Sequence, residues 1–133
     1  MPQENVESVR KFFDAFSRGD LEAFLEPLTP EFEFYPSGAF PDTKSVYRGR
    51  QGVAEFWDLF HGAWESITIS VERIEDLGEQ VLLLGTFHAI GRESGVEVTR
   101  QSAWLQAFRD GLLVRNWAFA SWAEALEAVG LSE

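Results

Sequence analysis

Residues 100–119, RQSAWLQAFRDGLLVRNWAF, carry the pattern of two β-strands joined at an Arg-Asp-Gly turn (109–111). Two turns fit this stretch, and they pair the strands differently. If only the last two residues of the triplet form a type I′ turn, Trp104 lies opposite Trp117. If all three form the turn, with the glycine left-handed in a bulge, Trp104 lies opposite Asn116. A type I turn followed by glycine suits x-Asp-Gly, so we favour the three-residue turn.

The three-residue turn divides the hairpin into two faces, and neither has the alternation of a face exposed to water. One face mixes aromatic rings with isolated polar groups: Arg100, Ser102, Trp104, Gln106, Phe108, Leu112, Val114, Asn116 and Ala118. The other face is smoother: Gln101, Ala103, Leu105, Ala107, Leu113, Arg115, Trp117 and Phe119. We expect the domain's own helices to cover the first face and enclose a pocket there. We expect a second subunit to cover the other face in a two-fold dimer.

The rest of the chain predicts a single α+β domain over residues 1–133 with the element order α-α-β-α-β-β-β-β-α. Helical spacing of apolar residues covers 5–18 and about 50–64; Asp20 caps a short second helix, and Ser121 opens a short last one. Strands are expected at 31–36, 66–75, 80–90, 96–108 and 112–119. A curved, mostly antiparallel sheet would then wrap over the N-terminal helices. The connection 37–49 has the length of a lid or binding loop.

Composition excludes several classes of function. The formal charge of −11 and the lack of clustered Lys and Arg argue against nucleic acid and anionic membranes as partners. The absence of cysteine excludes disulfides, thiolate zinc sites and a cysteine nucleophile. No apolar segment resembles a signal peptide or a membrane span, so we expect a soluble, cytoplasmic protein. The 12 Phe and 5 Trp residues suit a core built around an apolar hollow.

Three stretches, in order, resemble the SnoaL-like branch of the nuclear transport factor 2-like superfamily. They are RGDLEAFLEPLTPEFEFYP (18–36), YRGRQGVAEFWDLF (47–60) and FRDGLLVRNW (108–117). The resemblance spans about residues 5–131 and implies a cone-shaped, cystatin-like α+β barrel, frequently dimeric through its outer sheet face. A pocket would lie between the concave sheet and the helices. The family includes ketosteroid isomerase, polyketide cyclases, dehydratases, epoxide hydrolases and non-catalytic binding domains, so the fold does not choose among them.

The residues matching the catalytic positions of the isomerase and the cyclases carry no acid or base. The isomerase tyrosine, its aspartate base and its protonated aspartate align with Phe12, Pro36 and Trp104. The His and Asp that the cyclases place around a Trp in the last strand align with Asn116 and Ala118. These side chains cannot transfer a proton, so neither known chemistry is expected.

The candidate ligand-binding residues are Trp57, Arg100, Ser102, Trp104, Asn116 and Tyr35. Arg100 would clamp a carboxylate or carbonyl, which Ser102 and Asn116 would orient. The alternative for Arg100 is a place at the barrel mouth, paired with surface carboxylates. The resemblance implies that Trp57 and Trp104 line the cavity, although core packing explains either equally well, and Tyr35 could donate from the rim.

His61 and His88 are the only histidines and the only candidates for a catalytic base. We expect neither a metal site nor a cofactor, because no ligand cluster, phosphate loop or dinucleotide motif is present. Our first hypothesis is a domain that binds a small, largely apolar molecule bearing a carbonyl or carboxylate, in a cavity of a few hundred cubic ångströms. The alternatives are a lyase, isomerase or hydrolase that uses a pocket histidine, and a plain dimerisation module.

Overall fold

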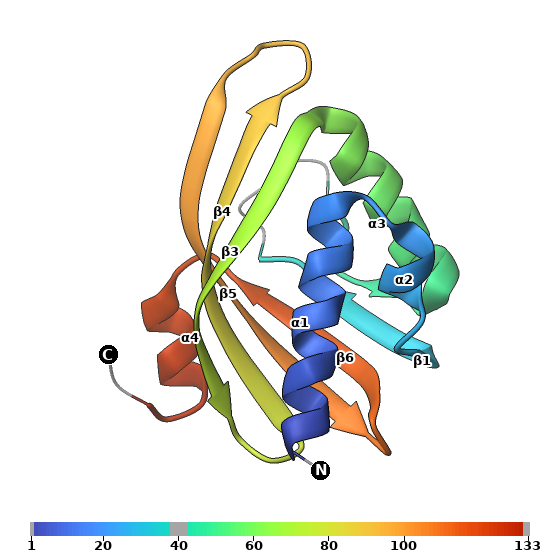
Figure 1. The fold of residues 1–133 in the computed structure, drawn as a ribbon, viewed down its shortest axis with the longest axis vertical. Helices are drawn as coiled ribbons and strands as arrows, with labels where there is room; N and C mark the ends of the chain where they lie inside the picture. Colours follow the sequence, from blue (N-terminus) through green and yellow to red (C-terminus); the bar gives the residue numbers. More distant parts are fainter. Residues whose placement is uncertain (1, 38–42, 132–133) are drawn as a thin grey trace.

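The computed structural model describes residues 2–37 and 43–131 and has the predicted α+β architecture (Figure 1). Its elements are α1 (Pro2–Arg18), α2 (Leu21–Leu25), β1 (Leu28–Tyr35), β2 (Tyr47–Arg48), α3 (Gly49–Ala63), β3 (Trp64–Asp76), β4 (Gln80–Gly91), β5 (Glu97–Arg109), β6 (Leu112–Phe119) and α4 (Trp122–Ala128). The helices α1, α2 and α3 lie on the concave side of a curved sheet, and α4 lies on the other side (Figure 1). Among the described residues, no helix is both long and apolar enough to cross a membrane.

The sheet has six strands in the order β2-β1-β6-β5-β4-β3 and is not closed. The pair β1–β6 is parallel and the other four pairs are antiparallel. The predicted mostly antiparallel, curved sheet is therefore confirmed. Two details differ from the prediction. The first strand begins at Leu28 rather than at residue 31, and the short strand β2 lies within the segment predicted as the 37–49 connection. Residues 38–42 of that connection lie outside the described part of the chain.

Short polar signals set the helix boundaries as predicted. Gly19, with φ +75°, ends α1 in the left-handed region that other residues avoid. The side chain of Asp20 accepts a hydrogen bond from the backbone N–H of Ala23 at 3.1 Å and caps α2. Ser121 caps α4 in the same way, accepting from the N–H of Glu124 at 3.2 Å.

The hairpin turn differs from the prediction, because Asp110 and Gly111 alone form it. Both residues have positive φ, 53° and 81°, as a type I′ turn requires, and the flanking Arg109 and Leu112 are partners. The extra residue that we placed in the turn lies instead in β6, where a bulge leaves Val114 without a Cα partner. Leu112 is therefore exposed, and Leu113 is the residue that packs in the main core.

Beyond the bulge at Val114, the residues of β6 face the sides of the sheet that we predicted for them. Asn116 lies opposite Gln106, and Trp104 lies opposite Ala118, so the indole and the amide share the concave face. A one-residue bulge reverses which side chains face the core, so the bulge cancels the effect of the shorter turn. The prediction that Trp104 and Asn116 face inward together is correct, although the pairing that led to it was wrong by two residues.

Two apolar cores lie on the two sides of the sheet. The larger one fills the space between the concave face and α1, α2 and α3. The smaller one lies on the convex face under α4 and contains Leu82, Leu84, Ala103, Leu105, Ala125 and Leu126. The indole N–H of Trp122 fixes the start of α4 by donating to the backbone oxygens of Gly85 and Ser102, at 3.0 and 3.1 Å. The chain's own last helix therefore covers part of the face that we assigned to a second subunit.

Candidate functional site

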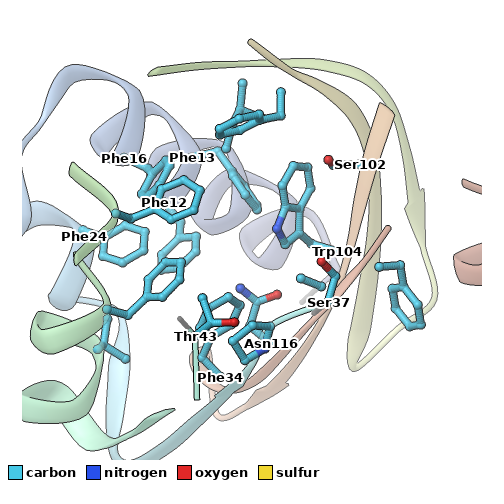
Figure 2. A pocket seen from close by; sticks show the side chains of 18 of the residues that line it. Phe12, Phe13, Phe16, Phe24, Phe34, Ser37, Thr43, Ser102, Trp104 and Asn116 are labelled. Carbon is cyan, nitrogen blue, oxygen red and sulfur yellow. The ribbon is translucent and has the colours of Figure 1, made fainter. Parts of the chain in front are cut away.

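A cavity lies between the concave face of the sheet and the helices α1, α2 and α3, where the resemblance implies a pocket (Figure 2). Its volume is about 70 Å³, below the few hundred cubic ångströms expected. Its apolar wall consists of Phe12, Phe13, Phe16, Phe24, Phe32, Phe34, Pro36, Val53, Phe56, Phe60, Ile69, Phe87, Trp104, Ala118 and Phe119. Ser37, Thr43, Ser102 and Asn116 are the polar residues that line it. None of the described lining residues carries a charge.

Aromatic packing holds the helices against the sheet around this cavity. The rings of Phe12 and Phe24 stack at 4.1 Å, which joins α1 to α2. Phe13 on α1 reaches Trp104 on β5 at 4.8 Å with an interplanar angle of 54°. Each such pair contributes about 0.5–1.5 kcal/mol beyond the apolar area it buries. The walls therefore come from separate elements that ring contacts fix in place.

Three of the four polar lining residues, Ser37, Thr43 and Asn116, lie near one another, where β6 meets the ends of the 37–49 connection, and Ser102 lies apart from them (Figure 2). Figure 2 shows the Asn116 amide close to Thr43 and Phe34, and the indole nitrogen of Trp104 directed toward the same space. Asn116 is buried, and its Oδ1 atom has no hydrogen-bond partner in the described chain. An indole N–H can only donate, while an amide can donate and accept. Together these groups can bind a polar substituent on an otherwise apolar molecule.

Three of the six predicted ligand-binding residues line the cavity, namely Ser102, Trp104 and Asn116. Arg100 faces the same side of the sheet as its partner Phe87 but is exposed and does not line the cavity. Phe87 lines the cavity and packs against Phe60 of α3 at 5.6 Å, so the lining at this level of the sheet comes from β4 rather than from Arg100.

The other two predicted residues, Trp57 and Tyr35, also lie outside the lining. The Trp57 ring is buried between elements: it stacks on His61 at 4.1 Å and packs against Phe24 at 4.9 Å. Tyr35 lies on the convex face, where its ring stacks on Trp117 at 6.0 Å and its hydroxyl donates to Glu33 at 2.8 Å. Neither side chain is therefore placed to contact a molecule in the cavity.

Neither histidine lines the cavity. His61 lies between the rings of Trp57 and Phe16, and its Nε2 atom is buried with no hydrogen-bond partner among the described residues. Burial lowers the pKa of His61 below its usual value, because the charged form loses its hydration. His88 faces the convex side, where its Nδ1 atom lies 2.8 Å from the hydroxyl of Thr99. The described wall of the cavity thus has no histidine to act as a base.

The three positions that match the catalytic residues of the isomerase surround the same cavity. Phe12 on α1, Pro36 after β1 and Trp104 on β5 all line it, although they come from distant parts of the chain. The positions that match the isomerase's catalytic residues therefore lie together, and the apolar side chains at these positions form part of the cavity wall.

Most of the wall was not predicted residue by residue. Ten phenylalanines line the cavity, and the sequence placed several of them only as core residues on helical faces. The alternation of Phe32 and Phe34 in β1 already indicated one buried face. Ser37 and Thr43 flank the undescribed residues 38–42, and their position in a suspected binding loop was the only signal for them.

A second polar cluster lies on the convex face, away from the cavity, and centres on Glu33. Its carboxylate accepts hydrogen bonds from the Tyr35 hydroxyl at 2.8 Å, from Arg48 at 3.1 Å and from Arg115 at 3.2 Å. These donors hold the pKa of Glu33 below its usual value, with the Tyr35 bond contributing most. The same bond raises the pKa of the Tyr35 hydroxyl. Over residues 2–37 and 43–131, no group of three or more His, Asp or Glu side chains could hold a metal ion.

Comparisons with known proteins agree with this arrangement. The model of the SnoaL-like domain matches residues 9–116. No curated protein sequence matches.

Among solved structures, an NTF2-like protein of unknown function from Burkholderia pseudomallei is 22% identical with a TM-score of 0.79, over 93% of this chain and 95% of that one. TerC, co-crystallised with polyporic acid, is 18% identical with a TM-score of 0.80, over 96% and 98%. A proposed SnoaL-like polyketide cyclase from Jannaschia sp. CCS1 is 18% identical with a TM-score of 0.78, over 98% and 94%. At these identities the similarity to solved structures shows the fold alone. The match to the family model covers most of the chain, and the chain therefore belongs to the SnoaL-like domain family.

Proposed function

We propose that the cavity binds a small, neutral, largely apolar molecule that carries a carbonyl group. The observation that supports this most strongly is the cavity itself, an aromatic hollow in which Ser37, Thr43, Asn116 and the indole nitrogen of Trp104 lie near one another (Figure 2). Ligand sites differ from plain cores in this combination of apolar walls and a few convergent polar groups. The Trp104 indole N–H and the Asn116 amide N–H would donate to the carbonyl oxygen.

The charge of the lining favours a neutral ligand over a carboxylate. No described residue of the wall is charged, and Arg100, the cation expected to hold a carboxylate, does not line the cavity. A carboxylate buried without a cation loses its hydration, and no opposite charge in the described wall offsets that loss. The net charge of −11 also repels anions from the whole molecule.

The volume of about 70 Å³ favours a small ligand. The fold can hold a small organic molecule, since TerC was co-crystallised with polyporic acid. We propose binding without a cofactor or metal, and we assign no catalysis. The alternative hypothesis, a lyase, isomerase or hydrolase, needs a base in the cavity, and the described lining residues include no His, Asp or Glu.

Two probes of matched size test the proposal. Acetophenone is neutral and carries a carbonyl, whereas benzoate has nearly the same shape and carries a carboxylate. We expect acetophenone to raise the melting temperature in a dose-dependent way and benzoate to leave it unchanged, because only a ligand of the folded state stabilises it. The opposite ranking, or no shift from either compound, would contradict the proposal.

A cavity-filling variant shows where the probe binds. Ala118 lines the cavity opposite Trp104, so Ala118→Leu should fill part of the space and remove the acetophenone shift. Ala123→Leu, on the exposed side of α4, is the matched control and should keep the shift. An Ala118→Leu protein that binds as well as the wild type would place the probe elsewhere.

We also propose that the chain forms a homodimer through the part of the convex face that α4 leaves uncovered. This patch contains Glu33 and Tyr35 on β1, Arg48 on β2 and Arg115 on β6. Trp117 on β6 forms its edge, where it packs against the small core under α4 and stacks on Tyr35. Aromatic residues and arginine are the residue types enriched in interfaces. In a two-fold contact, a patch that carries both Glu and Arg can pair with its own copy.

Sedimentation velocity tests the dimer. The wild type should sediment with twice the chain mass of 15.1 kDa, and Trp117→Ser should shift the population toward the monomer. Leu59→Ser on α3, at an exposed apolar residue outside the patch, is the control and should leave the dimer intact. A wild-type protein that remains monomeric as its concentration rises would refute this assembly.

A further inference from the structure

Two side-chain amides lie opposite each other on the concave face, Gln106 on β5 and Asn116 on β6. Direct partners in an antiparallel pair have Cβ atoms about 5 Å apart, so the two amides are within reach of each other. Gln106 is 0% exposed and Asn116 is 4% exposed. Both amide atoms of Gln106 and the Oδ1 atom of Asn116 have no hydrogen-bond partner among the described residues.

Packing alone does not explain an amide at position 106. Its partner on β4 is Val81, and its concave-face neighbours on β5 are Trp104 and Phe108, all of them buried. A methionine or leucine would fit this apolar setting without an unpaired polar group. More than nine in ten buried polar groups in proteins have a partner, so three unpartnered polar atoms at one place call for a specific explanation.

We propose that Gln106 and Asn116 together form the polar end of the cavity and accept a hydrogen bond from an N–H or O–H group of the ligand. This inference rests on the proposed function and adds a donor to the ligand's chemistry. Asn116 lines the cavity and touches the ligand through Oδ1, the atom left without a partner. Gln106 does not line the cavity, so it acts through Asn116 as a positioning residue.

The roles of the two amides follow from their donors and acceptors. A carbonyl oxygen has two lone pairs. With a ligand bound, the Gln106 Nε2–H group donates to one lone pair of Asn116 Oδ1, and the other lone pair accepts from the ligand. This orientation turns the Asn116 Nδ2–H group toward the ligand's carbonyl oxygen. The favoured ligands are therefore neutral, flat molecules that carry a donor beside an acceptor, such as hydroxy-carbonyl compounds or lactams.

Indole and benzofuran test the donor directly, because they have the same shape and differ by one N–H group in place of an oxygen. We expect calorimetric titration of the wild type to give a Kd for indole about five- to tenfold lower than for benzofuran. In Asn116→Leu this preference should disappear while benzofuran still binds. In Gln106→Met the preference should fall, and Gln101→Met, on the convex side of the same strand, should keep it.

The ratio of the two Kd values separates positioning from a purely structural role. A structural defect would weaken both compounds together and leave the ratio unchanged. Equal binding of indole and benzofuran to the wild type, or a preference retained in Asn116→Leu, overturns this inference and leaves the proposed function standing. Failure of every neutral aromatic compound to bind overturns both. An unchanged ratio in Gln106→Met removes Gln106 from the site.

Discussion

Replacing the amide of Gln106 by the thioether of methionine should stabilise the protein. The side chain is 0% exposed, and neither its Oε1 nor its Nε2 atom has a partner among the described residues. A buried polar group without a partner costs about 1–3 kcal/mol relative to hydration in the unfolded chain. Methionine is unbranched, has nearly the same length as glutamine and adapts its shape easily, so repacking should cost less than about 1.5 kcal/mol.

The net gain should be about 1–2 kcal/mol in the free energy of unfolding. For a chain of 133 residues, each kcal/mol shifts the melting temperature by roughly 3–5 °C, so Gln106→Met should melt roughly 3–10 °C higher. Urea unfolding at 25 °C measures the free energy directly, and its m-value should stay unchanged, because the surface exposed on unfolding is nearly the same.

The matched control is Gln101→Met on the same strand, where the side chain is exposed. Surface substitutions of this kind stay within about 0.5 kcal/mol of the wild type. If Gln106→Met instead loses more than about 1 kcal/mol while Gln101→Met does not, the Gln106 amide has good hydrogen bonds in solution. The argument for an unsatisfied amide pair would then fail.

Two further predictions concern β4 and α3. Gly85→Ala should destabilise by about 1–3 kcal/mol, because the added Cβ would lie 2.5 Å from the backbone oxygen of Ser70 on β3. Its control, Gly62→Ala in α3, meets no atom within 4 Å and should gain about 0.5–1 kcal/mol in urea unfolding. Because burial lowers the pKa of His61, the unfolded chain takes up its proton first as the pH falls below about 6.5, and stability declines from there to the folded-state pKa. His61→Phe should flatten this decline between pH 7.5 and 5.5, and an unaltered pH profile would show that other groups cause it.

The fold was predictable because separate local signals agreed with one another. Gly19, Asp20 and Ser121 set helix ends that the structure confirms, and the two-residue period of the last four strands gave the sheet. The parallel pairing of β1 with β6 was not predictable in this way. It joins residues about 80 positions apart, such as Phe34 and Asn116, and no local pattern specifies such a pairing.

The turn shows where local chemistry stops being decisive. Asp110-Gly111 suits both a two-residue turn and the end of a three-residue turn. The choice depends on where the strands place one extra residue, and in this chain that residue is Val114 in the β6 bulge. Trp104 and Asn116 still face inward together as predicted, because the shorter turn and the bulge each reverse the alternation of β6 once and the two reversals cancel. Only Leu112 and Leu113, between the turn and the bulge, have their burial exchanged.

The candidate site was predictable only where strand alternation governs it. Ser102, Trp104 and Asn116 belong to the hairpin and line the cavity, as their position in the alternation indicates. Arg100 has the same alternation and lies opposite Phe87, but Phe87 lines the cavity whereas Arg100 is exposed and does not. Whether Trp57 and Tyr35 line the cavity depends on how their elements pack together, which the helix and strand periods do not determine. Periodicity gives the face of an element but not how far along the element the cavity extends.

Stability and binding should respond in opposite directions to the same change at position 106. A core selected only for packing would place an apolar side chain between Val81, Trp104 and Phe108. If Gln106→Met raises the free energy of unfolding and also reduces the preference for indole over benzofuran, the amide contributes to ligand selectivity and lowers the stability of the fold. If stability falls while the preference stays unchanged, Gln106 belongs to the packing of the core. These two measurements on one variant therefore decide whether the Gln106 amide serves ligand selectivity or core packing.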